Sequence, residues 1–283
     1  MLKQRIITAI ILLAVLLPAL VYPSPEPFCL LILVLIAAGA WEWGRLNKLG
    51  SGASWTLALV AVLICAGLWQ GGWLAKPSVS LWLPVGALWV LVGASLIKRG
   101  VDGWAKIAGP LRVAGGLLAL CLTWLAVCQA RVIGINFLLS ILVLVWVADI
   151  AAYFAGRAFG LRFTKVKLAP AISPGKSWEG VWGGMTGVLL LALGWIWGDQ
   201  FWQAASPSLY SRLASANVVL LILAVVFLAA MSVVGDLVES LIKRSAGVKD
   251  SSGLLPGHGG VLDRVDALLP TLPLAMMLYC TVA

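Results

Sequence analysis

The chain has 283 residues, of which 62% are hydrophobic and only 11% are charged. Soluble globular domains are about 45–50% apolar and about 25% charged, so this composition excludes an ordinary cytosolic enzyme, a disordered chain and a disulfide-stapled secreted domain. An integral membrane protein remains, in agreement with the mean hydropathy of +1.04. The net charge of +9 is explained by helix orientation and by anionic lipids or substrates, without a nucleic-acid partner.

Nine apolar segments follow one another along the chain, each near the roughly 20 residues that a membrane-spanning helix needs. They cover residues 6–22, 28–44, 55–73, 80–97, 113–130, 136–156, 181–198, 214–238 and 262–282. Their apolar runs are continuous, whereas an outer-membrane barrel would alternate apolar and polar residues. The sequence therefore predicts an all-α integral membrane protein with about nine transmembrane helices, the first of them retained because no small-residue cleavage site follows it.

The basic residues are distributed unevenly between the two sides that nine alternating spans define. With the N-terminus and its Lys3 and Arg5 in the cytoplasm, 17 of the 20 lysines and arginines fall on the inside. Only Lys76, Arg131 and Arg212 fall outside. Cytoplasmic loops of membrane proteins carry such an excess of positive charge, so the sequence predicts a cytoplasmic N-terminus.

The polar residues divide the chain into two regions. Residues 1–112, with about four spans and short loops, are expected to face lipid or to form a dimer contact. Residues 113–283, with about five spans, form the predicted catalytic region because they carry the long inside segments 157–180 and 239–261. In the first region, the only acid at a predicted membrane edge is Glu42.

A polar stripe begins where the apolar run 218–235 ends. It consists of Asp236, Glu239, Ser240 and Lys243, whose spacing places them on one face of a helix. Ionised carboxylates cost about 2.5–3.5 kcal/mol each at the centre of a membrane helix and less near its end. A salt-bridged solvated face is the alternative, and the segment that follows the stripe weakens it. Asp149, after the apolar run 141–148, is either a similar functional acid or a marker of the cytosolic interface.

The segment 240–266 combines bases, acids and glycines. Its charged or titratable members are Lys243, Arg244, Lys249, Asp250, His258, Asp263, Arg264 and Asp266. Pro256 and the neighbouring glycines exclude regular helix, and a glycine-rich loop offers backbone N–H groups to phosphate oxygens. Carboxylates suit Mg²⁺, and lysine and arginine suit phosphate, so the segment predicts a site for metal and polyphosphate. Two of the acids would also suit a helix N-terminus, and His258 by itself indicates neither a metal ligand nor a base.

A second polar cluster lies at residues 168–180. Its polar side chains are Ser173, Lys176, Ser177 and Glu179. Ser177 is a candidate N-cap of the helix that follows, with Glu179 in the first turn. Lys176 and the basic residues before it are explained by membrane topology, by contact with lipid head groups or by recognition of a nucleotide phosphate.

These segments resemble the phosphatidate cytidylyltransferase family, also called CDP-diglyceride synthase. The family signature is matched by Ser240, Lys243, Arg244, Lys249, Asp250, Pro256, His258, Gly259, Gly260, Asp263, Arg264 and Asp266. Residues 235–240 resemble the family's GDxxES stretch, and residues 173–180 resemble its SPxKTxEG stretch with Ser177 in place of threonine. Asp149 begins a D-x-x-A-Y-x-x-G stretch, and the specific resemblance covers the chain from there onward.

The resemblance implies that CTP and phosphatidic acid react to give CDP-diacylglycerol and pyrophosphate, with Mg²⁺ as cofactor and a second cation such as K⁺ left open. The implied metal ligands are Asp236, Asp263 and Glu239. The implied catalytic residues are Lys243, Arg244, Lys249, Asp250, His258, Arg264 and Asp266. The implied substrate-binding residues are Ser173, Lys176, Ser177, Glu179, Asp149, Ser240, Gly259 and Gly260. The resemblance further implies a homodimer in a bacterial inner membrane, among membrane lipids, with a polar catalytic funnel open to the cytoplasm.

Other functions compete with this one. A transporter or channel would also place polar residues at membrane depth, but these acids gather at one membrane face. A CTP-dependent kinase for a polyprenol or similar alcohol would use a related nucleotide site. A CDP-alcohol phosphotransferase is disfavoured because its paired DG…AR…G…D…D pattern is missing, and a purely structural membrane protein would not need the cluster at 236–266.

Overall fold

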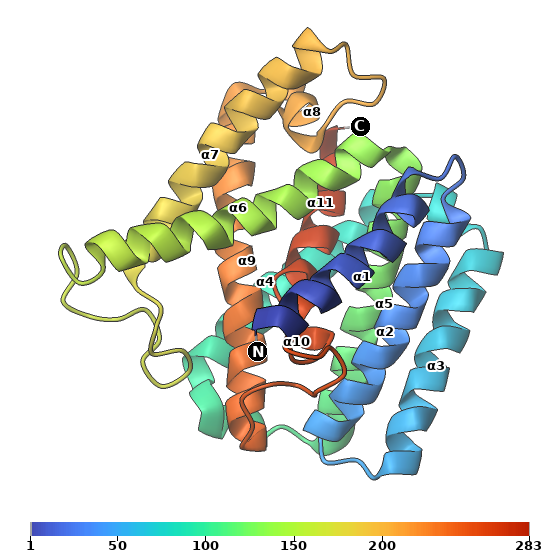
Figure 1. Ribbon diagram of the computed structural model, residues 1–283, viewed down its shortest axis with the longest axis vertical. Coiled ribbons are helices and arrows are strands. Elements are labelled where there is room, and N and C mark those ends of the chain that lie inside the picture. The colour runs from blue at the N-terminus through green and yellow to red at the C-terminus, as the bar shows by residue number, and fades with distance from the viewer. Residues whose placement is uncertain (1, 283) are drawn as a thin grey trace.

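Helices form every regular element between residues 2 and 282, the part of the chain that this computed structural model describes (Figure 1). They are α1 (Leu2–Val21), α2 (Glu26–Leu46), α3 (Ser51–Gln70), the 3₁₀ helix η1 (Trp73–Ala75), α4 (Val79–Ala105), α5 (Gly109–Ile133), α6 (Ile135–Phe159), α7 (Trp178–Phe201), α8 (Leu209–Ala216), α9 (Val218–Ala246), α10 (Leu262–Val265) and α11 (Leu268–Val282). The side chains of Lys3 and Arg5 lie outside the described part, so their cytoplasmic position stays a prediction.

Eight helical segments of the described chain are long and apolar enough to cross a membrane. They are α2 to α7, α9 and the segment Leu262–Val282, which includes α10 and α11. The helix α1 contributes a shorter apolar stretch, Ile6–Val21, so the ninth span stays a prediction. Helices satisfy their own backbone hydrogen bonds in lipid, and the predicted all-α fold with several apolar spans is confirmed to this extent.

The helix α9 carries the polar stripe and is longer than predicted. Asn217 caps its start, since the Asn217 side chain accepts hydrogen bonds from the amides of Val219 (2.7 Å) and Leu220 (3.3 Å), and the span therefore begins after the expected residue 214. With 29 residues, α9 is about 43 Å long, whereas the hydrocarbon core of a bilayer is about 30 Å thick. The helix is therefore long enough to cross the apolar layer and still extend beyond it by its polar last turns, which include Lys243.

Hydrogen bonds between the ends of helices define two ends of the bundle. At one end, which we call the motif end, Trp43 Nε1 of α2 donates to the carbonyl of Val113 near the start of α5 (3.1 Å). At the opposite end, the far end, Arg131 Nε of α5 donates to the carbonyl of Leu20 in α1 (2.9 Å). The motif end carries the loops 160–177 and 247–261. Both long polar segments that the sequence singled out thus lie at the same end of the bundle (Figure 1).

Small residues let α6 and α7 approach closely, and this contact positions the second polar cluster. A Cβ atom on Gly183 would lie 2.1 Å from Cβ of Ala155, and one on Gly187 would lie 2.6 Å from Cβ of Ala151. Such small-residue contacts are the usual means by which membrane helices pack. Because α7 starts at Trp178, the contact holds the segment just before it beside the end of α6.

Candidate active site

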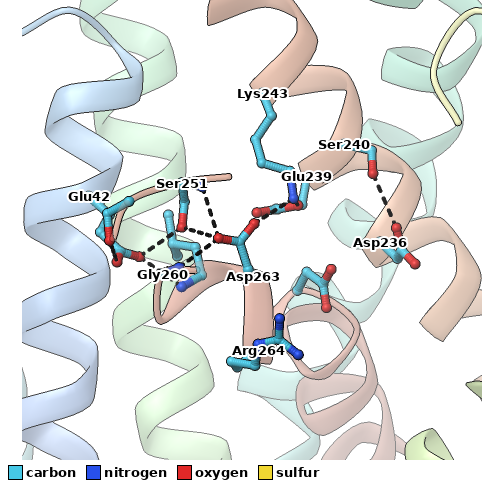
Figure 2. A network of polar contacts seen from close by, with 12 residues as sticks. Glu42, Asp236, Glu239, Ser240, Lys243, Ser251, Gly260, Asp263 and Arg264 are labelled. Atoms are coloured by element: carbon cyan, nitrogen blue, oxygen red, sulfur yellow. Dashed lines mark hydrogen bonds and ion pairs between the residues drawn. The ribbon is translucent and has the colours of Figure 1, made fainter. Parts of the chain in front are cut away.

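The polar stripe of α9 forms the axis of the site. Ser240 Oγ donates to Asp236 Oδ1 (3.2 Å), and the ammonium group of Lys243 pairs with the carboxylate of Glu239. Contacts at i, i+4 place these side chains along one side of the helix, as the spacing predicted. Figure 2 shows this stripe facing α10 and the loop that precedes it. Two groups of partners meet the stripe, one at each of its ends.

The first group joins the second polar cluster to α9. Lys176 Nζ lies 2.6 Å from Asp236 Oδ2, and the two side chains are 24% and 30% exposed. The carboxylates of Asp149 and Asp266 are close enough to interact electrostatically with that of Asp236. The backbone between α10 and α11 packs tightly against α9 at this point, since a Cβ atom on Gly235 would lie 2.5 Å from the Asp266 carbonyl oxygen. Residues from three separate parts of the sequence therefore surround Asp236.

The second group joins α9 to α10. Lys243 Nζ lies 2.6 Å from Asp263 Oδ1 and also contacts Glu239, so one lysine bridges two acids. The other oxygen of Asp263, Oδ2, accepts hydrogen bonds from the amide and hydroxyl of Ser251 and from the amide of Gly260, each at 2.8 Å (Figure 2). Asp263 thus holds the two sides of the loop 247–261, at Ser251 and at Gly260, against α9.

The loop closes on itself near its tip. Leu255 N donates to the Gly259 carbonyl (2.9 Å), and Gly259 has a φ of +83°, a conformation that favours glycine. The Arg264 guanidinium donates two hydrogen bonds to the His258 carbonyl, at 2.9 and 2.6 Å. Nδ1 of His258 is buried and has no hydrogen-bond partner among the described residues. These contacts close the predicted glycine-rich segment into a turn that Arg264 of α10 holds.

Three of the predicted catalytic residues are exposed and form no ion pair with the described acids of the site. Arg244 is exposed at the end of α9, and Lys249 and Asp250 are exposed at the start of the loop. Within the described residues, the ion pairs at the site involve only Lys176 and Lys243. The roles predicted for these three residues stay predictions, and a bound anion would draw only Arg244 and Lys249 inward.

The remaining predicted residues shape the segment before α7. Ser177 Oγ accepts from the Gly180 amide (3.2 Å), which confirms the predicted N-cap. The buried carboxylate of Glu179 accepts from the amides of Phe163 (3.1 Å) and Thr164 (2.7 Å). Ser173 closes a turn, its amide donating to the Ala169 carbonyl at 2.9 Å. Glu179 therefore holds the loop after α6, and the substrate-binding roles of these residues stay predictions.

The donor set fits a divalent cation that a substrate phosphate would complete. Five carboxylates gather here and face only two ammonium groups, those of Lys176 and Lys243, which leaves a formal charge of −3. The carboxylates are those of Asp149, Asp236, Glu239, Asp263 and Asp266. No three His, Cys, Asp or Glu side chains of the described chain form a ready-made metal cluster. Mg²⁺ commonly takes only one or two carboxylates together with phosphate oxygens and water.

The sequence analysis missed Glu42 and Ser251. Glu42 belongs to α2, in the region assigned no chemical role, yet its carboxylate contacts the loop 247–261 (Figure 2). Ser251 bonds to both Glu42 and Asp263. A signal for Glu42 was available, because a carboxylate at a membrane edge needs hydrogen-bond donors that its own apolar helix does not supply. No such signal existed for Ser251, one of several serines near the loop.

These features define a helical membrane protein with a site of acids and lysines at one end of its bundle. Residues 3–282 match the cytidylyltransferase family. Several proteins named phosphatidate cytidylyltransferase are similar to this chain over almost their whole length. The one from Pseudomonas aeruginosa is 39% identical, over 96% of this chain and 95% of the relative. Those from Haemophilus influenzae and Bacillus subtilis are 35% identical (99% and 99%) and 30% identical (96% and 95%).

The chain belongs to the cytidylyltransferase family. The resemblance to phosphatidate cytidylyltransferases that the motifs indicated is confirmed, and so is the prediction that the chain is an enzyme, a nucleotidyltransferase.

Proposed function

We propose that this chain transfers the CMP moiety of CTP to phosphatidic acid, giving CDP-diacylglycerol and pyrophosphate. One observation carries the proposal beyond family membership: two distant polar segments meet on α9 through the pairs Lys176–Asp236 and Lys243–Asp263. A reaction between two anionic substrates needs such a mixture of cations and acids in one place. The names of the relatives supply the identity of the two substrates.

The chemistry asks for neutralisation of charge more than for a strong base. A phosphomonoester loses its second proton near pH 6, so the lipid phosphate is largely ready to attack the α-phosphorus of CTP. The ammonium groups of Lys176 and Lys243 would move from carboxylates to phosphate oxygens when the substrates bind. Arg244, Lys249 and Arg264 would add positive charge at the mouth of the site, and the glycine-rich loop would offer backbone amides.

Asp236 and Asp263, with Glu239 beside them, would hold Mg²⁺. When bound, the metal would neutralise the phosphates of CTP and favour the departure of pyrophosphate. The partial exposure of Asp236 suits this role. Asp263 would keep its bonds to the loop through one oxygen and offer the other in exchange for Lys243. A second cation such as K⁺ is part of the same proposal.

The proposed setting is a bacterial inner membrane with the motif end in the cytoplasm. The excess of basic residues in the loops of that side supports this orientation. The substrate lipid would reach the acids from the surrounding bilayer, and CTP would enter from the water through a polar funnel. A homodimer and the separation of residues 1–112 from residues 113–283 also belong to the proposal.

The decisive experiment uses the full-length protein purified in detergent. With radiolabelled CTP, Mg²⁺ and phosphatidic acid, it should form a CDP-lipid and release pyrophosphate, and omission of either the lipid or Mg²⁺ should prevent product formation. Formation of CDP and a phosphorylated polyprenol when that alcohol replaces phosphatidic acid would favour the kinase. A folded protein that makes no CDP-lipid would contradict the proposal.

A further inference from the structure

Among the described residues, Glu42 is the most deeply buried acid at the motif end. It lies in the last turns of α2, between two tryptophans, and its side chain is fully buried. A buried carboxylate is tolerated when hydrogen-bond donors replace its lost hydration. The donors that surround it belong to a part of the sequence more than 200 residues away.

Four donors meet the Glu42 carboxylate, two from each end of the loop 247–261 and its junction with α10. They are Ser252 Oγ and Val261 N (2.9 Å) at Oε1, and Leu262 N (2.8 Å) and Ser251 Oγ (3.2 Å) at Oε2. The Ser251 hydroxyl has one proton, which it shares between Glu42 and the nearer Asp263 Oδ2. Ser251 and Ser252 lie before the tip of the loop, and Val261 and Leu262 lie after it. Glu42 therefore ties the two strands of the loop together (Figure 2).

The same contacts continue to the proposed metal ligand. Ser251 Oγ lies between the two acids, 3.2 Å from Glu42 and 2.8 Å from Asp263. Gly260 is pressed against both partners, since a Cβ atom there would lie 2.3 Å from Glu42 Oε1 and 2.0 Å from Ser251 Oγ. The amides that Glu42 accepts from are those just before Asp263, so a shift of Glu42 would move Asp263 relative to Lys243.

We propose that Glu42 is a positioning residue for the transfer reaction: through Ser251 and the start of α10, it sets the place of Asp263 opposite Lys243. The inference rests on the proposed function, because it takes the acids of α9 and α10 as the reacting site. It assigns to the N-terminal region a part in the reaction, in addition to any lipid-facing or dimer-forming role.

Asp199 provides a matched control for the test. Its carboxylate also accepts hydrogen bonds that hold a helix start, from Ser208 N (2.9 Å) and Ser211 Oγ (2.6 Å) at α8. It lies at the far end of the bundle, in α7, away from the loop. Glu42→Gln and Asp199→Asn therefore make the same chemical change, carboxylate to amide, at the two ends of the same protein.

The experiment measures kcat, the KM for CTP and hydrogen exchange in full-length protein in detergent. We expect Glu42→Gln to lower kcat by about 10²-fold, the cost of misplacing a reacting group by about 1 Å, with little change in the KM for CTP. Backbone amides in 250–262 should exchange faster, while those in 205–216 stay unchanged. Asp199→Asn should give the reverse pattern of exchange and wild-type kcat per folded molecule.

The inference is wrong if Glu42→Gln keeps wild-type kcat and wild-type exchange over 250–262. It is equally wrong if both variants lose activity only in proportion to the loss of folded protein. Should Glu42→Gln fail to accumulate, Ser252→Ala removes one of the four donors, and slower turnover with faster loop exchange would support the proposal; no change in either would overturn it. A wild-type protein that makes no CDP-lipid contradicts the proposed function instead, and the loop exchange still reports on Glu42.

Discussion

The far end and the motif end each hold a carboxylate that fastens a helix start, but only the motif end combines it with charged partners. At the far end, Asp199 accepts hydrogen bonds from neutral groups alone. These are Asn136 Nδ2 (2.8 Å), Ser208 N (2.9 Å) and Ser211 Oγ (2.6 Å). At the motif end, Asp263 accepts from neutral groups on one oxygen and from the ammonium of Lys243 on the other.

The difference separates a structural joint from a site that can change partners. Backbone amides and the short side chains of Asn and Ser have little freedom to move, so the donors to Asp199 are held in place by the fold. A lysine is a flexible point charge that moves readily from a carboxylate to a phosphate oxygen. The motif end holds two such lysines amid excess acid, and this is the arrangement that an anionic substrate with a divalent cation would reorganise.

The largest effect is expected from removing an acid of the polar stripe. Asp236→Asn should lower kcat by about 10³-fold, comparable to the loss of one strong electrostatic contact in an active site, because an amide neither holds Mg²⁺ well nor pairs with Lys176. Initial rates of CDP-lipid formation at saturating CTP measure the change. Membrane insertion and thermal unfolding should stay near wild type, since the Asp236 side chain bonds only to Lys176 and Ser240 among the described residues.

Asp263→Asn should lower kcat as strongly and should also destabilise the protein, because Asp263 Oδ2 holds both strands of the loop. The pair of variants thus separates the chemical role from the structural one. A near wild-type rate in either variant would refute its assignment as a metal ligand.

A smaller loss is expected from removing a lysine. Lys176→Met should lower kcat/KM by about 10²-fold, as the loss of one member of a close charge pair typically does, mainly through a higher KM for CTP or the lipid. Lys167→Met is the matched control, because Lys167 lies in the same loop and, within the part of the chain that the structure describes, donates only to the Pro174 carbonyl (2.8 Å). Equal losses in the two variants would mean that general positive charge, and not the pair with Asp236, matters.

A still smaller effect should follow from adding one methyl group to the loop. Gly260→Ala would force a Cβ atom against Glu42 and Ser251, and repacking of a tight contact costs about 1–3 kcal/mol. We expect kcat to fall by about tenfold and the unfolding temperature to drop. Gly253→Ala, where no atom of the described residues lies within 4 Å of the added group, should leave both unchanged. Indistinguishable results for the two variants would contradict the tight contact at Gly260.

Hydropathy predicted most of the fold because each membrane helix is a continuous apolar run. The spacing of polar residues predicted the polar stripe and the N-cap at Ser177 correctly, since both depend on local sequence. Hydropathy did not predict the short helix α8, or that α4 continues to Ala105 across a non-helical Gly100. These features depend on contacts with other helices and on backbone conformation, and the hydropathy of a segment reports on neither.

The composition of the candidate site was predictable, but its pairing was not. Motif spacing identified both Lys176 and Asp236, yet nothing in either segment states that they meet. Their contact follows from the close packing of α7 on α6 and of both on α9. The sequence shows Glu42 only as an acid without local partners, because its hydrogen-bond donors belong to residues that follow it by more than 200 positions.

The smallest expected effect on catalysis belongs to the far end and completes the comparison. Asp199→Asn keeps one acceptor oxygen but loses the charge that strengthens three hydrogen bonds. Hydrogen bonds to charged groups contribute about 1 kcal/mol more than bonds between neutral groups, so weakening three of them should lower the free energy of unfolding by about 3 kcal/mol, measured by thermal unfolding in detergent. Turnover per folded molecule should not change, because the Asp199 network has no exchangeable charge and no contact with the loop. A lower kcat at an unchanged folded fraction would mean that the far end takes part in the reaction, and the distinction between a fixed joint and an exchangeable site would no longer hold.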